Sequence, residues 1–221
     1  MKHTSTFVTR ERPRIQVLEE RLLAGLELVD KIKKLCPDCL VVLAGGLVRD
    51  YWFETTVGFN TGGKGDIDIL IAPPQGNVEA EYQAHRLAES QAFDLVECHD
   101  ITTKFSESSR GDVSDAGNPQ NRSVVGCEYK GHPVDIIIRN QIHTSIPEMI
   151  EGFDSPINQF YVDPETCEII IGYDPHVEEL AYNLEVGNET RMKRFDLMHS
   201  KLREHLRNSK NPYAWAAVRG E

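Results

Sequence analysis

The 221-residue chain has the length of one domain, or of one domain with a small helical extension, and it can bury a core without disulfide bonds. Its composition, 40% hydrophobic and 27% charged, is ordinary for a soluble globular protein. The formal net charge of -11 argues against an extensive polynucleotide-binding surface, because broad nucleic-acid binders carry a basic footprint.

No segment is predicted to direct the chain to a membrane or out of the cell. The longest apolar run, residues 40–48, contains two glycines and is too short to cross a bilayer. The first 14 residues lack the apolar region of a signal peptide. The five cysteines are an odd number, which indicates free thiols in a reducing compartment. We therefore expect a cytoplasmic protein.

Hydrophobic spacing divides the first part of the chain into an arm, a helix and a strand–turn–helix unit. Residues 1–14 are interpreted as a loose arm, and apolar residues recur at helical spacing through 15–35, which predicts an amphipathic helix. A valine-rich run at 40–43 predicts a buried strand. Gly45-Gly46 interrupts this strand, and residues 47–54 are predicted to form a second helix.

The middle of the chain alternates between loops and short regular elements. A glycine-rich loop at 55–65 precedes a strand at 66–71, where apolar and acidic residues alternate. Residues 78–91 are predicted to be helical, and 93–97 to form a strand. The segment 102–122 is rich in Ser, Asp, Gly and Asn and predicts a long loop.

The last part of the chain predicts two hairpins and three helices. In order, the predicted elements are strands 123–129 and 133–138, a short helix at 144–151, strands 160–162 and 168–171, and helices near 176–185 and 189–207. A polar tail follows at 208–221. Together these elements predict an α/β (α+β) fold, with a mixed, mainly antiparallel sheet flanked by helices.

Three aspartates form a candidate metal site. Asp66 and Asp68 lie two residues apart on one predicted strand, so both side chains project from the same face while Ile67 points into the core. Asp135 lies within a second apolar strand, where an unpartnered carboxylate would be costly. An Asp-x-Asp pair alone is often a chance occurrence. If the two strands are neighbours, however, the carboxylates converge and suit Mg²⁺ or Mn²⁺.

A glycine turn is the second candidate feature. Gly45-Gly46 lies between a strand and a helix, where glycine lets a phosphate approach the backbone and the helix start offers N–H groups. Arg49 can add a charge-assisted contact, and Lys64 precedes Asp66 in a position to meet phosphate. The alternative interpretation is a tight turn required only for packing.

The order of these motifs resembles a known family. Gly-Gly-x-x-Arg-Asp at 45–50, a glycine-rich loop and Asp-Ile-Asp at 66–68 resemble the nucleotidyltransferases of the DNA polymerase β type. More narrowly, they resemble the branch of the tRNA CCA-adding enzymes and poly(A) polymerases. Residues 153–166 and 188–195 resemble two further segments of that branch.

The resemblance implies additional binding residues. It implies that Asp50, Asp154 and Asn158 contact the nucleotide, and that Arg191 and Arg194 reach its triphosphate. Two arginines three apart on one helical face suit phosphate recognition, although a solvated helix end is an equally ordinary interpretation.

The resemblance also implies a reaction. We expect a nucleotidyltransferase that uses Mg²⁺ or Mn²⁺ to transfer a nucleoside monophosphate from an NTP to an acceptor hydroxyl, releasing pyrophosphate. An RNA 3′ end is one candidate acceptor; the tRNA-gripping helical body of that branch is not evident after residue 195. Nucleotidylation of a protein or small molecule, and a catalytically inactive nucleotide-binding regulatory module, are the alternatives. The catalytic domain is expected at 15–174, between the arm at 1–14 and a short helical segment at 175–221.

Overall fold

The structure is a computed structural model. It describes residues 13–63, 65–73, 101–103, 121–139, 143–183 and 189–209. Residues 1–12 of the predicted arm, the helix at 78–91, the strand at 93–97, residues 210–221 of the predicted tail and Lys64 lie outside the described residues. Residues 13 and 14 of the predicted arm are helical, so the helix begins earlier than predicted.

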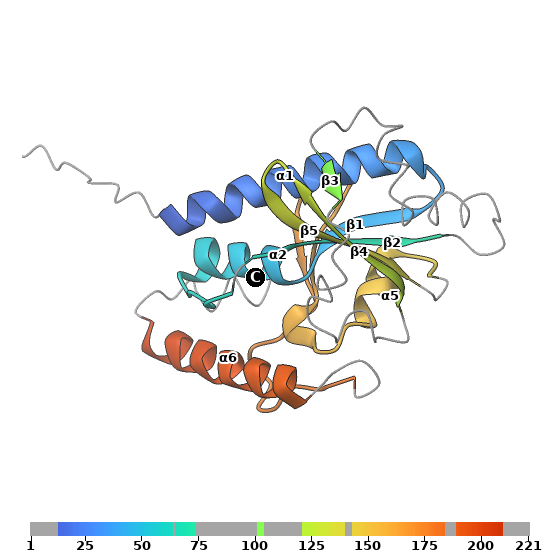
Figure 1. Cartoon of the computed structure of the whole chain (residues 1–221). Coiled ribbons are helices and arrows are strands. Elements are labelled where there is room, and N and C mark those ends of the chain that lie inside the picture. The colour runs from blue at the N-terminus through green and yellow to red at the C-terminus, as the bar shows by residue number, and fades with distance from the viewer. Residues whose placement is uncertain are drawn as a thin grey trace, which may run out of the picture.

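A mixed sheet forms the centre of the fold (Figure 1). Its seven strands have the order β3-β4-β5-β2-β1-β6-β7. Their bounds are β1 Leu40–Ala44, β2 Ile67–Ala72, β3 Ile101–Thr103, β4 Asn121–Tyr129, β5 His132–Arg139, β6 Phe160–Val162 and β7 Ile169–Ile171. The pairing of β2 with β5 is parallel, and the other described pairings are antiparallel. The predicted mixed, mainly antiparallel sheet is therefore confirmed.

In the described part of the chain, four α-helices surround this sheet. They are α1 Pro13–Leu35, α2 Gly46–Trp52, α5 Ile146–Glu151 and α6 Glu189–Asn208. A π-helix, Phe53–Val57, continues α2, so helical structure extends into the predicted glycine-rich loop. Figure 1 shows α1 above the sheet and α6 below, with α2 between them. Within the described ranges, no helix has both the length and the apolar character needed to cross a lipid bilayer.

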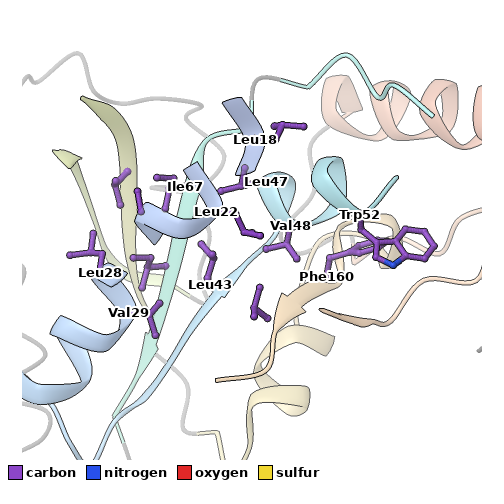
Figure 2. Close-up of a cluster of buried hydrophobic side chains, with 14 of the residues drawn as sticks. Leu18, Leu22, Leu28, Val29, Leu43, Leu47, Val48, Trp52, Ile67 and Phe160 are labelled. Atoms are coloured by element: carbon purple, nitrogen blue, oxygen red, sulfur yellow. The ribbon is translucent and has the colours of Figure 1, made fainter. Parts of the chain in front are cut away.

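The alternation of side chains along the strands produces two hydrophobic clusters, one on each face of the sheet. Ile67 and Ile69 belong to the larger cluster, under α1 and α2, whereas Leu70 belongs to the smaller cluster under α5. Figure 2 shows the larger cluster, in which Leu22 of α1 and Leu47 of α2 meet side chains of β1, β2 and β6. This packing fixes α1 and α2 against the strands that carry the candidate aspartates.

Three sequence-based predictions require correction. The segment predicted as a helix near 176–185 is not helical in its described part, because Asp174 accepts a hydrogen bond from the backbone N–H of His176 and turns the chain there. Residues 101–103 form β3, and β4 begins at Asn121, so both ends of the predicted loop 102–122 pair in the sheet. A short 3-10 helix, Pro156–Asn158, was not predicted.

Candidate functional site

The parallel pairing of β2 and β5 brings two of the predicted aspartates together. Asp68 of β2 is the direct register partner of Asp135 of β5. Neighbouring strands lie about 4.8 Å apart, and register partners project from the same face. Asp66 immediately precedes β2. The two strands are therefore neighbours, which is the condition under which the carboxylates were expected to converge, although the residues lie far apart in the sequence.

These carboxylates lie in the solvent-accessible part of β2 and β5, two central strands of the sheet. Asp68 and Asp135 are partly exposed, and Asp66 is exposed. Along the same strands, Leu70 and Ile137 are buried beneath α5. The strands therefore change from a covered apolar section to an open acidic section within one period of the pleat. A carboxylate in this position can contact a ligand while the strand that carries it stays packed in the sheet.

The described carboxylates do not form a preassembled metal cluster. Among the described residues, no group of three or more His, Cys, Asp or Glu side chains has the arrangement needed to hold a metal ion. A pair is nevertheless sufficient for Mg²⁺, which commonly takes one or two carboxylates and completes its shell with water and substrate phosphate. Asp68 and Asp135 are the pair that fits this requirement, with Asp66 next to them.

The cysteine beside the aspartates is not a competing ligand or nucleophile. Cys127 pairs with Val134, one residue before Asp135. Burial, and in addition the negative charge of Asp135, raise the pKa of the Cys127 thiol to about 12. Metal binding and nucleophilic attack both require the thiolate. Cys127 is therefore a neutral thiol, and its side chain belongs to the larger hydrophobic cluster, on the face of the sheet opposite to Asp135.

Gly45 places backbone directly against Asp68. Its φ of 80° lies in the region that only glycine adopts without strain. A Cβ atom at this position would lie 3.0 Å from Oδ2 of Asp68. The N–H of Gly45 donates to the carbonyl of Phe160 at 2.7 Å, which ties the turn to β6. The Gly-Gly turn thus brings the backbone of Gly45 so close to the carboxylate of Asp68 that a side chain at position 45 would crowd it.

Arg49 and Asp50 form a buried polar network. Nε of Arg49 donates to Oδ1 of Asp50 at 2.9 Å, and NH1 donates to Oδ1 of Asn158 at 2.9 Å. Arg49 is 5% exposed and Asp50 is 1% exposed. The carboxylate of Asp50 also lies against Gly63, where an added Cβ would approach Oδ2 to 1.9 Å. This network joins α2 to the glycine-rich loop and to the 3-10 helix, so it positions three predicted binding segments relative to one another.

The two remaining predicted segments meet through an ion pair. Nε of Arg191, on α6, lies 2.5 Å from Oδ2 of the buried Asp154. Arg194 is exposed, and its guanidinium lies 5.4 Å from the centroid of the Phe195 ring. Arg191 lies 5.7 Å from the same centroid. The structure therefore connects Asp154 with Arg191, while Arg194 faces solvent on the same helix.

A cleft of ≈ 670 Å³ opens beside the aspartates. Asp66 and Asp135 line it, together with Gly62 and Gly63 of the glycine-rich loop. Its opposite wall comes from α1, where Arg14 and Arg21 point to the same helical face because they are seven residues apart. These two arginines were not identified from the sequence, although their spacing on an otherwise amphipathic helix was the signal that marks them.

Comparison with solved structures shows a structural similarity, whereas comparison with family models and curated proteins shows none. No protein-family model matches the chain, and no curated protein matches it. The chain is similar to a solved structure titled "tRNA-processing enzyme (apo form I)", with 15% sequence identity and a TM-score of 0.40. The match covers 71% of this chain and 33% of the other, so this chain spans about a third of that protein's length.

Proposed function

We propose that the protein is a metal-dependent nucleotidyltransferase that transfers a nucleoside monophosphate from an NTP to an acceptor hydroxyl. The observation that carries this proposal is the register pairing of Asp68 with Asp135, with the backbone of Gly45 close to the Asp68 carboxylate. Two partly exposed carboxylates and an adjacent glycine turn are the groups that a metal–triphosphate complex requires.

The proposed role of each residue follows from its position. Asp68 and Asp135 would hold Mg²⁺ or Mn²⁺, with Asp66 assisting from the strand entrance. When bound, the metal supplies Lewis-acid stabilisation of the charge that develops on the phosphoryl oxygens. Asp135, at the side of the site facing the cleft, would accept the proton of the attacking hydroxyl.

The reaction balances without a further co-reactant. The acceptor oxygen forms a bond to the α-phosphorus of the NTP, and the bond between that phosphorus and the bridging oxygen of pyrophosphate breaks. The proton of the hydroxyl passes to Asp135, and pyrophosphate leaves with the electron pair of the broken bond. The protein contributes by positioning the two substrates and by stabilising charge, as in other phosphoryl transfers.

We assign the nucleotide to the side of the site formed by α2, β6 and the start of α6. Gly45 and Gly46 would meet the triphosphate, with Lys64 as an additional cation. Arg49 and Asp50 support this side through their buried network with Asn158. Asp154, Asn158, Arg191 and Arg194 remain predicted nucleotide contacts, and the Asp154–Arg191 ion pair supports the grouping of these segments.

One observation favours a second candidate function, a nucleotide-binding module without catalysis. The described acidic side chains do not form a ready-made cluster for a metal. In this alternative the glycine turn and the arginines bind an NTP, and no transfer follows. The nucleotide-transfer test described next distinguishes catalysis from binding alone.

The test is nucleotide transfer with each α-³²P-labelled NTP and Mg²⁺ or Mn²⁺, with total RNA or cell lysate as acceptor. We expect label to appear in an acceptor and to vanish in the Asp66→Ala/Asp68→Ala double variant. Label in RNA identifies an RNA-tailing enzyme, and label in protein or small molecules identifies another acceptor. Folded protein that binds NTP but transfers no label with either metal would contradict the catalytic proposal and support the binding module.

A further inference from the structure

A pair of cysteines lies where α1 passes into β1. Cys36 directly follows α1, which ends at Leu35, and Cys39 directly precedes β1, which begins at Leu40. Figure 1 shows the chain turning back between these two elements. Both cysteine side chains belong to the larger hydrophobic cluster, and both are free thiols in this structure. The proposed nucleotide transfer uses neither of them, so the pair is considered for a chemistry of its own.

The turn between the two cysteines holds them at the separation that a disulfide requires. The N–H of Cys39 donates to the carbonyl of Cys36 at 3.1 Å, which closes a β-turn with Pro37 and Asp38 at its centre. The first and fourth Cα atoms of a β-turn lie less than about 7 Å apart. A disulfide usually spans about 4.4–6.8 Å between its Cα atoms. The backbone can therefore accept this bond with little movement.

The two thiols already interact with each other. A side-chain hydrogen bond with Cys39 lowers the pKa of Cys36, although burial acts in the opposite direction. The same hydrogen bond, together with burial, raises the pKa of Cys39. The pair therefore combines a sulfur that ionises more readily with a neighbouring neutral thiol. A nucleophilic cysteine next to a resolving cysteine has this arrangement.

The position of the turn suits a small oxidant. Pro37 and Asp38 are exposed, whereas Cys36 is 1% exposed and Cys39 is 6% exposed. The thiols thus lie beneath a surface turn at the end of a helix, where local opening costs less than opening of the core. A bulky disulfide compound would need a wide opening of this turn. Hydrogen peroxide, which is only slightly larger than water, needs a much smaller one.

A structural zinc site is the other common use of a Cys-x-x-Cys pair. Such a site takes four ligands, so a second pair of Cys or His side chains is required. In the ranges that the structure describes, no group of three or more His, Cys, Asp or Glu side chains could hold a metal ion. The described part of the chain therefore favours dithiol chemistry at this pair over a zinc centre.

We propose that Cys36 and Cys39 form a peroxide-sensitive dithiol that is oxidised to an intramolecular disulfide. The ionised Cys36 sulfur attacks one oxygen of hydrogen peroxide, the O–O bond breaks, and Cys36 becomes a sulfenic acid as hydroxide leaves. The Cys39 sulfur then attacks the Cys36 sulfur, the S–O bond breaks, and a second hydroxide leaves. The protons of the two thiols convert both hydroxides to water. Each cysteine loses one electron, and the peroxide is reduced to water.

The disulfide acts on the junction of α1 with β1. The N–H of Cys36 donates to the carbonyl of Ile32 at 2.9 Å, which continues the last turn of α1. A bond to Cys39 therefore joins this turn covalently to the residue before β1. Gly45 lies at the other end of β1, roughly 20 Å away at about 3.3 Å per residue. The inference does not depend on the proposed function, because no nucleotide, metal or acceptor takes part in it.

The first experiment measures the masses of tryptic peptides after the folded, reduced protein is treated with hydrogen peroxide and its remaining thiols are alkylated. Cleavage after Lys34 and Arg49 gives a peptide that contains Cys36 and Cys39 and no other cysteine. We expect this peptide to lose two hydrogen atoms, to escape alkylation, and to recover both thiols on reduction with dithiothreitol. Cys167, which is exposed, is the internal control and should keep its thiol at the peroxide dose that converts the pair.

Two serine variants test the order of the steps. Cys39→Ser keeps an O–H donor beside Cys36 but removes the resolving sulfur, so Cys36 should accumulate a sulfenic acid that dimedone labels. Cys36→Ser removes the first nucleophile, and dimedone labelling of Cys39 should be at least about tenfold weaker, because burial disfavours its thiolate. Stronger labelling of Cys39 than of Cys36 would overturn the proposed order.

The wild-type measurement decides the proposal even where a variant does not fold. Failure of the folded protein to form the disulfide, or a disulfide that forms only after urea has unfolded the chain, would overturn it. A disulfide that joins Cys36 or Cys39 to a different cysteine of the chain would also overturn it. Nucleotide transfer is measured separately on the reduced protein, so the failure of either proposal is recognised without the other.

Discussion

Two polar regions adjoin β2, and they differ in how their charges are satisfied. On the α2 side, Arg49 and Asp50 are buried and hydrogen-bonded to one another, and Arg49 also reaches Asn158. On the neighbouring strands β2 and β5, Asp68 and Asp135 are partly exposed and are register partners. A buried pair contributes to the fold only while both partners are present, whereas an exposed acidic pair costs the fold little and can bind a cation. We therefore expect substitutions in the buried network to lower mainly the stability, and substitutions of the two aspartates to lower mainly the activity.

The largest expected effect is a loss of catalysis on substitution of Asp68 or Asp135. Asp68→Asn and Asp135→Asn should each lower the transfer rate by about 1,000-fold or more, because each removes a proposed metal ligand. The free energy of unfolding should change by less than about 1 kcal/mol, because both side chains are partly exposed. Radiolabel transfer and urea unfolding measure the two quantities. Full activity in both variants would contradict the assignment of these residues.

The buried network should show the opposite pattern, with a large loss of stability. Arg49→Met leaves the carboxylate of Asp50 buried without its counter-charge, which should cost about 3–5 kcal/mol. Lys193→Met is the matched control, since it breaks the exposed pair with Glu189 on α6 and should cost less than about 0.5 kcal/mol. Urea unfolding of the two variants checks the prediction. Similar losses in both would mean that burial of the Arg49–Asp50 pair has no energetic consequence.

The glycine turn lies between the two regions, and a smaller effect is expected there. Gly45→Ala forces a side chain into the left-handed region and toward Oδ2 of Asp68, 3.0 Å away. The positive φ alone should lower the free energy of unfolding by about 1–2 kcal/mol once the residue is alanine. Gly131→Ala has a similar φ of 78° but no atom within 4 Å of the added Cβ, so it is a control for the positive φ without a side-chain contact. The difference in unfolding free energy between the variants isolates the contact with Asp68. Gly45→Ala should also reduce NTP affinity, whereas Gly131→Ala should not.

The smallest expected effect concerns pH and the packing of α6. Burial lowers the pKa of His199, whose ring nitrogens contact the Tyr173 hydroxyl and the Val177 carbonyl. A lowered pKa means that the unfolded state binds the proton more readily, so stability falls as the pH falls from about 6.5 toward the folded-state pKa. His143 has a pKa shifted in the same direction by burial.

The measurement is the unfolding temperature between pH 7.5 and 5. The decline on acidification should be smaller in His199→Phe than in the wild type, whatever its absolute stability. Glu27 does not interfere, because its hydrogen bond with Lys130 lowers its pKa from 4.5 to about 2, and its contribution is lost only below this range. An identical slope in both proteins would show that His199 is not a source of the pH dependence.

The sequence predicted the local elements well because their signals are local. Helical spacing identified α1, and the alternation of Ile67, Asp68 and Ile69 identified β2. The segment after Pro175 was wrongly predicted as a helix because its composition suits one, whereas the side chain of Asp174 turns the chain. Composition does not reveal a hydrogen bond of this kind.

The residues of the candidate site were proposed from the sequence, but the contacts between them could not be. The position of Asp135 among apolar neighbours suggested a partner, yet its pairing with Asp68 depends on a sheet order that no spacing encodes. The contact between Arg49 and Asn158 spans 109 residues and was equally hidden. Arg21 was missed because a cation on the polar side of an amphipathic helix is usually only solvated.

The most direct test of the central claim is Mn²⁺ binding, followed by electron paramagnetic resonance in the presence of a non-hydrolysable NTP analogue. The claim that Asp68 and Asp135 hold a metal with the nucleotide predicts that the signal of free Mn²⁺ decreases in the wild type and in Lys193→Met. It also predicts that the decrease is lost in Asp68→Asn and Asp135→Asn, which remain folded. Undiminished Mn²⁺ binding in either aspartate variant would contradict the claim.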